Sequence, residues 1–201
     1  MIRVRSLESL VVLLAVVPVV AAQPPRPKPP DGTKVLANLE YVPGGHERQR
    51  LDLYVPAEAD APLPVIVWIH GGAWLGGSKE MGVPALPFVG KGYAVASINY
   101  RLSQHAVFPA QIEDCKAAIR WLRANARTYN LNAGRIGVWG ASAGGHLVAL
   151  LGTSGGVEDF DGKGGNADRS SRVQAVVDFF GPTDFLQMDA PQTPMCCGSR
   201  L

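Results

Sequence analysis

The sequence has little charge and no large excess of either sign. Its formal net charge is +2 with 18% charged residues, a balance that does not indicate a nucleic-acid partner. It also lacks an apolar run of the roughly 20 residues that cross a bilayer, because Leu10 to Val20 is shorter and contains Pro18. The composition is that of an ordinary globular protein, and 201 residues are enough for one sizeable core.

The short apolar run predicts a secretory signal. Residues 1–22 place Arg3 and Arg5 ahead of the run and end on the small residues Ala21 and Ala22, a plausible cleavage point. We therefore expect a secreted or periplasmic protein with no stable membrane span after cleavage. An uncleaved N-terminal anchor is the alternative.

Cysteines are few, and their number is odd. Three cysteines in an exported chain predict a free thiol or a partner outside the chain. Cys115 lies on the apolar face of a predicted helix, so we expect a buried thiol there. Cys196 and Cys197 are adjacent and could pair with cysteines that this chain lacks, in a connectivity that does not follow from sequence.

Proline is concentrated directly behind the signal. Residues 23–32 contain too many fixed φ angles for a helix or sheet, so they predict an extended linker. The folded domain is expected over residues 33–201.

Four apolar runs with β-branched residues predict strands that are covered on both faces. They are Val65 to Ile69, Tyr93 to Ile98, Ile136 to Trp139 and Val173 to Phe180. Two shorter strands, Val35 to Tyr41 and Arg50 to Val55, are expected to pair in antiparallel fashion through the turn at Pro43 to Gly45.

The clearest helix begins at Pro109 and carries apolar residues from Ile112 to Leu122 at spacings of three and four. Buried strands that alternate with such helices predict an α/β fold with a mainly parallel sheet. Functional groups then gather at the carboxyl ends of the strands. Residues 152–168 are rich in glycine and acidic residues, so we expect a mobile surface loop above that edge.

Ser142 is the centre of the sequence Gly140-Ala141-Ser142-Ala143-Gly144, which follows a predicted strand and precedes the helix-compatible residues 146–151. This pattern is typical of a nucleophile elbow, a sharp turn that lifts one serine hydroxyl clear of the backbone. Small neighbours let the turn close without clashes. The elbow predicts acyl transfer to water with Ser142 as the nucleophile.

A second motif, His70-Gly71-Gly72-Ala73-Trp74, follows the strand that ends at Ile69. Its glycines let backbone N–H groups approach a ligand closely, so the amides of Gly71, Gly72 and Ala143 are the expected oxyanion hole. Either motif alone is explained by a tight turn or a helix start. The two together, each after a buried strand, favour catalysis.

With Asn99-Tyr100-Arg101-Leu102 and Phe180-Gly181-Pro182-Thr183-Asp184, these motifs resemble the α/β-hydrolase superfamily. More narrowly, residues 35–190 are similar to bacterial esterases of the hormone-sensitive-lipase-like and feruloyl or acetyl-xylan esterase-like groups. The resemblance implies a three-layer sandwich and a secreted carboxylic-ester hydrolase without a metal or organic cofactor. It also implies an acid and a histidine after the last two strands, so we expect this chain to lack those strands and residues and to be inactive alone.

Residues already present offer poor substitutes for that acid and histidine. His146 lies one helical turn beyond the nucleophile, and packing is its expected role. The resemblance implies that His70 orients backbone, while His46 and His105 fall in turn-like segments. Asp184 follows a strand end and is expected to be a structural turn residue.

The expected substrate is a small-molecule or glycan-linked ester. His70 and Trp74 are expected to border its pocket, and Trp74 with Phe108 could wall an acyl or aromatic site, although aromatic residues belong more often to the core. No metal is predicted, because the aspartates of the glycine-rich segment lack EF-hand spacing: Asp159, Asp161 and Asp168.

Two alternatives to an esterase stay open. A non-catalytic protein could keep the hydrolase pocket for binding; the missing histidine favours this reading, and the intact elbow and oxyanion loop disfavour it. An amide hydrolase similar to formamidases or peptidases would use the same nucleophile and oxyanion hole, so these residues do not separate the two reactions.

Overall fold

The computed structural model of the chain describes residues 28–188. The predicted signal, half of the predicted linker, and both Cys196 and Cys197 lie outside this range. Within it, Cys115 is a buried free thiol, as predicted. No helix in the described range is long and apolar enough to cross a bilayer.

Six strands form a single sheet in the order β1-β2-β4-β3-β5-β6. They are β1 (Thr33–Glu40), β2 (Arg50–Pro56), β3 (Leu63–Ile69), β4 (Ala94–Ile98), β5 (Leu131–Ala141) and β6 (Ala175–Phe179). The pairs β1–β2 and β2–β4 are antiparallel, while β4, β3, β5 and β6 run parallel. The predicted mainly parallel sheet with an antiparallel start is confirmed.

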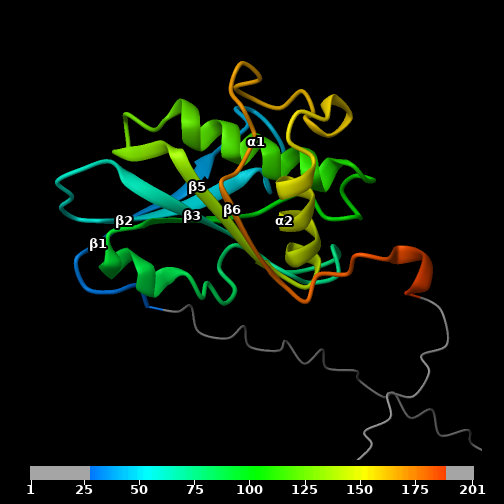
Figure 1. Ribbon diagram of the computed structural model, residues 1–201, viewed down its shortest axis with the longest axis horizontal. Helices are drawn as coiled ribbons and strands as arrows, with labels where there is room; N and C mark the ends of the chain where they lie inside the picture. Colours follow the sequence, from blue (N-terminus) through cyan, green and yellow to red (C-terminus); the bar gives the residue numbers. More distant parts are fainter. Residues whose placement is uncertain (1–27, 189–201) are drawn as a thin grey trace, which may run out of the picture.

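Two helices, α1 (Ala110–Ala124) and α2 (Ala143–Thr153), pack side by side on one face of the sheet (Figure 1). The opposite face carries a short 3-10 segment, η1 (Leu86–Lys91). Two further 3-10 turns, η2 (Glu158–Phe160) and η3 (Phe185–Gln187), lie after α2. In the described residues, the expected third layer therefore consists of η1 alone.

Strand alternation divides the core between the two faces. On β3, Val65, Val67 and Ile69 join the large cluster beneath α1 and α2, whereas Trp68 belongs to the smaller cluster beneath η1. Successive side chains of a strand point to opposite faces, so one strand supplies both clusters.

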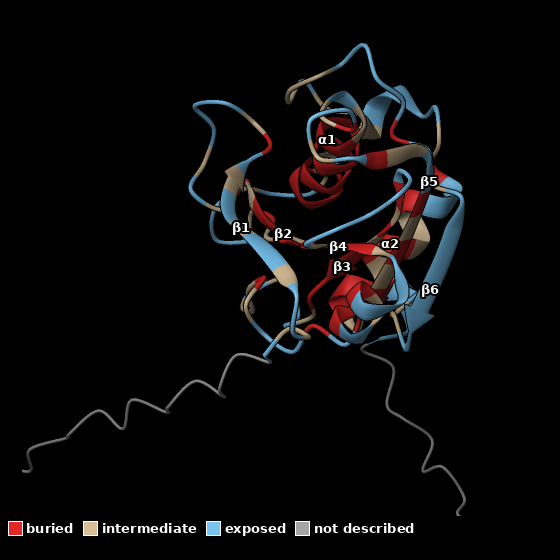
Figure 2. Ribbon diagram, turned by 90° about the vertical axis from the view of Figure 1, so that its left-hand side faces the viewer, coloured by how far each residue is buried: buried red, intermediate tan, exposed pale blue. Residues whose placement is uncertain are grey.

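The edge strand β6 differs from the prediction for Val173 to Phe180. The apolar run predicted a strand covered on both faces, whereas the expected lack of the last strands predicted an exposed sheet edge. All five residues of β6 are exposed, as the pale blue strand in Figure 2 shows. The strand is last in the sheet order and has one neighbour, β5, among the described residues. An apolar run alone does not distinguish a central strand from an edge strand, since both present the same pattern.

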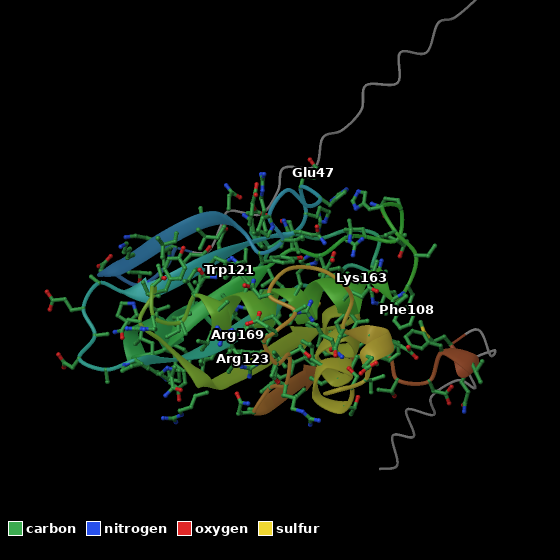
Figure 3. The ribbon with its side chains drawn as sticks, turned by 90° about the horizontal axis from the view of Figure 1, so that it is seen from above. Glu47, Phe108, Trp121, Arg123, Lys163 and Arg169 are labelled. Carbon is green, nitrogen blue, oxygen red and sulfur yellow. The ribbon has the colours of Figure 1, made fainter. Side chains whose placement is uncertain are left out.

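The segment that follows α2 is hydrogen-bonded to side chains of α1, whereas residues 152–168 were predicted to form a mobile loop. Lys116 is fully buried, and its Nζ donates to the carbonyl oxygen of Ser154 at 2.8 Å and to Oδ1 of Asp161 at 2.9 Å. Arg120 donates to three further loop carbonyls, and Arg123, labelled in Figure 3, donates to two more. Basic side chains from one helix thus replace solvent as partners of the loop backbone.

Candidate active site

The predicted elbow has the geometry that its sequence indicates. Ser142 stands between the end of β5 and the start of α2, with φ 55° and ψ −122°. A positive φ is uncommon outside glycine and persists only where the surroundings enforce it. Here the Ser142 amide donates to the carbonyl of Phe179 on β6 at 2.9 Å, which ties the strained residue to the neighbouring strand.

Glycines let the oxyanion loop approach the elbow directly. A Cβ on Gly71 would lie 2.8 Å from the carbonyl oxygen of Ala141 and 3.3 Å from Cβ of Ser142. A Cβ on Gly144 would lie 2.7 Å from the carbonyl oxygen of His70. Backbone therefore meets backbone on both sides of Ser142, and a larger residue at either glycine would push the two motifs apart.

Backbone amides are available beside the serine. No described residue accepts a hydrogen bond from the amides of Gly71 or Gly72, and Gly72 has a φ of 115°. Ala143 is the first residue of α2, where the amide has no partner within the helix. Of the residues predicted to form an oxyanion hole, Gly71 contacts Ser142 and Ala143 follows it in the chain, and the amides of Gly71 and Gly72 have no acceptor among the described residues.

His70 lies behind the oxyanion loop and does not border the pocket. Its side chain is 2% exposed and stacks on Tyr100 with the ring centroids 4.5 Å apart. Burial, aided by the charge of Arg48, lowers the pKa of His70 to about 4, although the bond to the Gly71 carbonyl opposes this. The ring is therefore neutral near pH 7, and the expectation of a pocket-lining His70 is corrected.

The polar residues that support this loop were not predicted as site residues. Tyr100 donates its hydroxyl to the carbonyl of His70 at 3.0 Å. Arg101 forms a two-pronged ion pair with the buried Asp114, with bonds of 2.7 to 3.1 Å. Asn99 accepts from the amide of Lys79 at 2.7 Å. The position of residues 99–101 directly after a parallel strand was the available signal, since strand ends gather functional groups.

The remaining histidines do not approach the serine hydroxyl as bases. In the described residues, nothing hydrogen-bonds to Oγ of Ser142. His146 packs edge-on against Trp74 and Phe185, with centroids 5.4 and 4.9 Å apart, and its Nδ1 is buried without a partner. Desolvation lowers the pKa of His146, and the charge of Asp178 partly offsets this.

The other two histidines and Asp184 have local structural roles. His46 and His105 lie against each other at 4.7 Å, and each accepts from a nearby amide through Nδ1. Asp184 accepts from the amide of Leu186 at 3.2 Å and caps η3. The prediction of a structural turn residue at position 184 agrees with this contact.

A cavity of about 620 Å³ lies beside the oxyanion loop and α2. Its lining is mostly apolar and includes Trp74 and Phe108, for which the sequence left a pocket wall open beside the more usual core position. The other lining residues are Ser103, Val107, Gln111, His146, Leu147, Leu150 and Phe185. Figure 3 places Phe108 at the end of the molecule from which η3 projects. The cavity suits an apolar or aromatic group.

Asp161, one of the aspartates of the glycine-rich segment, binds protein groups. The Asp161 carboxylate accepts from the Lys116 ammonium and, at 3.1 Å, from the hydroxyl of Ser171. The described part of the chain contains no group of three or more histidine, cysteine, aspartate or glutamate residues placed to share a metal ion.

Comparison with known proteins gives consistent matches. The sequence model of the family described as BD-FAE matches residues 51–198. Esterase LipC of Mycobacterium tuberculosis is 35% identical over 65% of this chain and 33% of its own length. The probable carboxylic ester hydrolase LipM of the same organism is 34% identical over 78% of this chain and 36% of its own.

Among solved structures, a "Truncated form of carbohydrate esterase from gut microbiota" matches with a TM-score of 0.75 and 39% identity. The match covers 80% of this chain and 61% of that one. The chain spans about a third of the length of the curated relatives it matches.

Proposed function

The chain belongs to the BD-FAE family, and from this membership we propose that it is a carboxylic-ester hydrolase whose nucleophile is Ser142. The observation that carries the proposal is the strained serine between β5 and α2, in backbone contact with an oxyanion loop whose amides are unused. The relatives described as esterases support the reaction class.

In the proposed reaction, Oγ of Ser142 attacks the carbonyl carbon of the ester and loses its proton to a base. The carbonyl oxygen becomes negative and accepts from the amides of Gly71, Gly72 and Ala143; losing one such donor typically costs about 3–4 kcal/mol of transition-state stabilisation. The alcohol leaves with a proton, and water then releases the acid from the acyl-serine. The residue that takes the proton is not among the described histidines.

We propose an ester of a sugar or a small alcohol as the substrate. The carbohydrate esterase among the matched structures supports the sugar. The cavity next to Trp74 fits an apolar or aromatic acyl group, because three aromatic side chains line it: Trp74, Phe108 and Phe185. The proposal also includes export, which rests on residues 1–22 and predicts a mature N-terminus near Gln23, measurable by N-terminal sequencing.

A binding protein that retains the pocket is the second candidate. Its support is that no described base contacts the Ser142 hydroxyl. Amide cleavage uses the same nucleophile and donors, so it is a further version of the first proposal and is tested with an aryl amide beside the ester.

The test combines turnover of an aryl acetate with labelling by a fluorophosphonate, which reacts with an activated serine. We expect Ser142→Ala to abolish labelling, whereas the matched control Ser103→Ala, at an exposed serine of the cavity, keeps it. Labelling that persists in Ser142→Ala would refute the nucleophile. A folded chain that neither labels nor turns over ester, but binds it, would favour the binding protein.

A further inference from the structure

Arg48 lies in the turn between β1 and β2, far in sequence from the elbow, yet its side chain reaches the oxyanion loop. Its Nε donates to the carbonyl of Tyr100 at 2.8 Å. Its Nη2 donates to the carbonyl of Gly77 at 2.9 Å and lies 3.2 Å from Nε2 of His70. One guanidinium therefore contacts the segment after β4 at Tyr100, the carbonyl of Gly77 just after the loop, and the imidazole of His70.

Arg48 forms no ion pair that would explain its place. Among the described residues, no carboxylate lies within hydrogen-bonding distance of it, whereas Arg50 pairs with Glu40 and Arg101 with Asp114. Desolvation lowers the pKa of Arg48, and the nearby carboxylates Glu80 and Glu47 oppose this only in part. Its donors are directed at the loop and at the strand-end segment behind it.

The contact with His70 fixes the position of a proton. A guanidinium has donors and no acceptor, so Nε2 of His70 must accept from Arg48. The neutral ring then carries its hydrogen on Nδ1, which lies 2.7 Å from the carbonyl oxygen of Gly71 and donates to it. With the opposite tautomer, two lone pairs would face each other at this contact.

The bond to Gly71 in turn sets the direction of an amide. The peptide between Gly71 and Gly72 is trans, so its carbonyl and its N–H point in opposite directions. While His70 holds the carbonyl, the Gly72 N–H points away from the ring. Gly71 itself is in contact with Ser142, so the peptide that carries this amide starts at a residue that touches the serine.

We propose that Arg48 is a positioning residue for the oxyanion hole: it selects the His70 tautomer and thereby the orientation of the Gly72 amide. The proposal rests on the proposed function, since an oriented amide matters only if an oxyanion forms there. The orientation itself is a property of the folded chain and is measurable without turnover.

The test uses the full chain with ¹⁵N-labelled histidine and glycine. We compare Arg48→Met and Arg48→Lys with the matched control Arg50→Met, which removes an arginine paired with the exposed Glu40. In the unaltered chain and the control, we expect a neutral His70 with its proton on Nδ1 down to about pH 5. The charged groups that act on His70 are Arg48 and Glu80, and the Tyr100 ring covers it.

In Arg48→Met we expect His70 to titrate at higher pH, because a positive charge and a donor to Nε2 are gone. The Gly72 amide signal should shift, and fluorophosphonate labelling of Ser142 should slow by about tenfold or more as the donor loses its alignment. The labelling rate of Arg48→Lys should lie between those of the unaltered chain and Arg48→Met. Added guanidinium ions should restore part of the labelling rate in Arg48→Met.

An unchanged His70 titration and Gly72 signal in a folded Arg48→Met chain would overturn the proposal. Circular dichroism checks folding, and Arg48→Lys serves in the same comparison if the methionine variant unfolds. If the unaltered chain shows no labelling at Ser142, the proposed function fails, while the two NMR measurements still decide whether Arg48 orients the loop.

Discussion

Ser142 and His70 show how single residues at this site are held by hydrogen bonds to backbone carbonyl groups. Ser142 has a positive φ, and its backbone amide donates a hydrogen bond to the carbonyl of Phe179. The imidazole of His70 donates a hydrogen bond from Nδ1 to the carbonyl of Gly71. Replacing His70 therefore removes a donor to the loop backbone, whereas Ser142→Ala keeps the amide that donates to Phe179. The conformation of the loop at Gly71 is therefore linked to the protonation of His70 at Nδ1.

A pH dependence of stability follows from the burial of His70. The unfolded chain binds a proton at His70 below about pH 6.5, whereas the folded chain does so only below about pH 4. Stability is therefore lost as the pH falls through this window, by up to about 3 kcal/mol. Urea unfolding at pH 7 and pH 4.5 measures it.

The comparison variant is His70→Asn, which should lose this part of the pH slope, with His105→Asn as a control at an exposed histidine. Equal slopes in the unaltered chain and in His70→Asn would show that His70 is not held neutral.

At the level of residues, the sequence predicted the sharp turn at Ser142, because a serine between small residues after a strand leaves few other backbone paths. It did not reveal Arg48, because an arginine in a polar turn is indistinguishable from a solvated one until the turn is placed against β4. The burial of His70 was missed for the same reason: a histidine beside glycines indicates a loop but not which side of the loop it faces.

Among the elements, α1 does more than cover the sheet. Its buried basic residues donate hydrogen bonds to backbone carbonyls of the segment between α2 and β6. The spacing of three and four identified the helix, but the burial of Lys116 and Arg120 contradicts the usual preference of these residues for solvent. From the sequence pattern alone, charged residues of a helix are assigned to its solvent-facing side. The structure shows that the segment after α2 covers that side of α1.

Removing the Lys116 ammonium should loosen that segment. In Lys116→Met, the carbonyl of Ser154 and the carboxylate of Asp161 lose their donor, so we expect a stability loss of about 2–3 kcal/mol. Hydrogen exchange should rise over residues 154–168 and stay unchanged at the elbow. The control is Lys163→Met, an exposed lysine of the same segment, and similar exchange in both variants would contradict the role given to Lys116.

The whole molecule is asymmetric. One face of the sheet is covered by two helices, whereas the other carries η1 and an apolar cavity of about 510 Å³ against Trp139, Val177 and Phe179. This cavity adjoins β6, whose backbone has an open side in the described residues. An exposed apolar edge strand is a site where chains associate.

A lysine on this surface should oppose association. We expect Val177→Lys to lower the apparent mass by light scattering at high concentration, since a charge in the apolar cavity disfavours a second chain there. The matched control is Val35→Lys on β1, the opposite edge of the sheet. Equal effects of both substitutions would mean that charge in general, and not the β6 edge, controls association.

The bond between the Ser142 amide and Phe179 also has a consequence for biosynthesis. The ribosome makes Ser142 well before Phe179, and Gly181, which packs against the start of α2, comes later still. Until β6 has left the exit tunnel, the strained serine lacks the strand that holds it. In the nascent chain, the strained backbone of Ser142 is therefore fixed only late in translation, after β6 has been made.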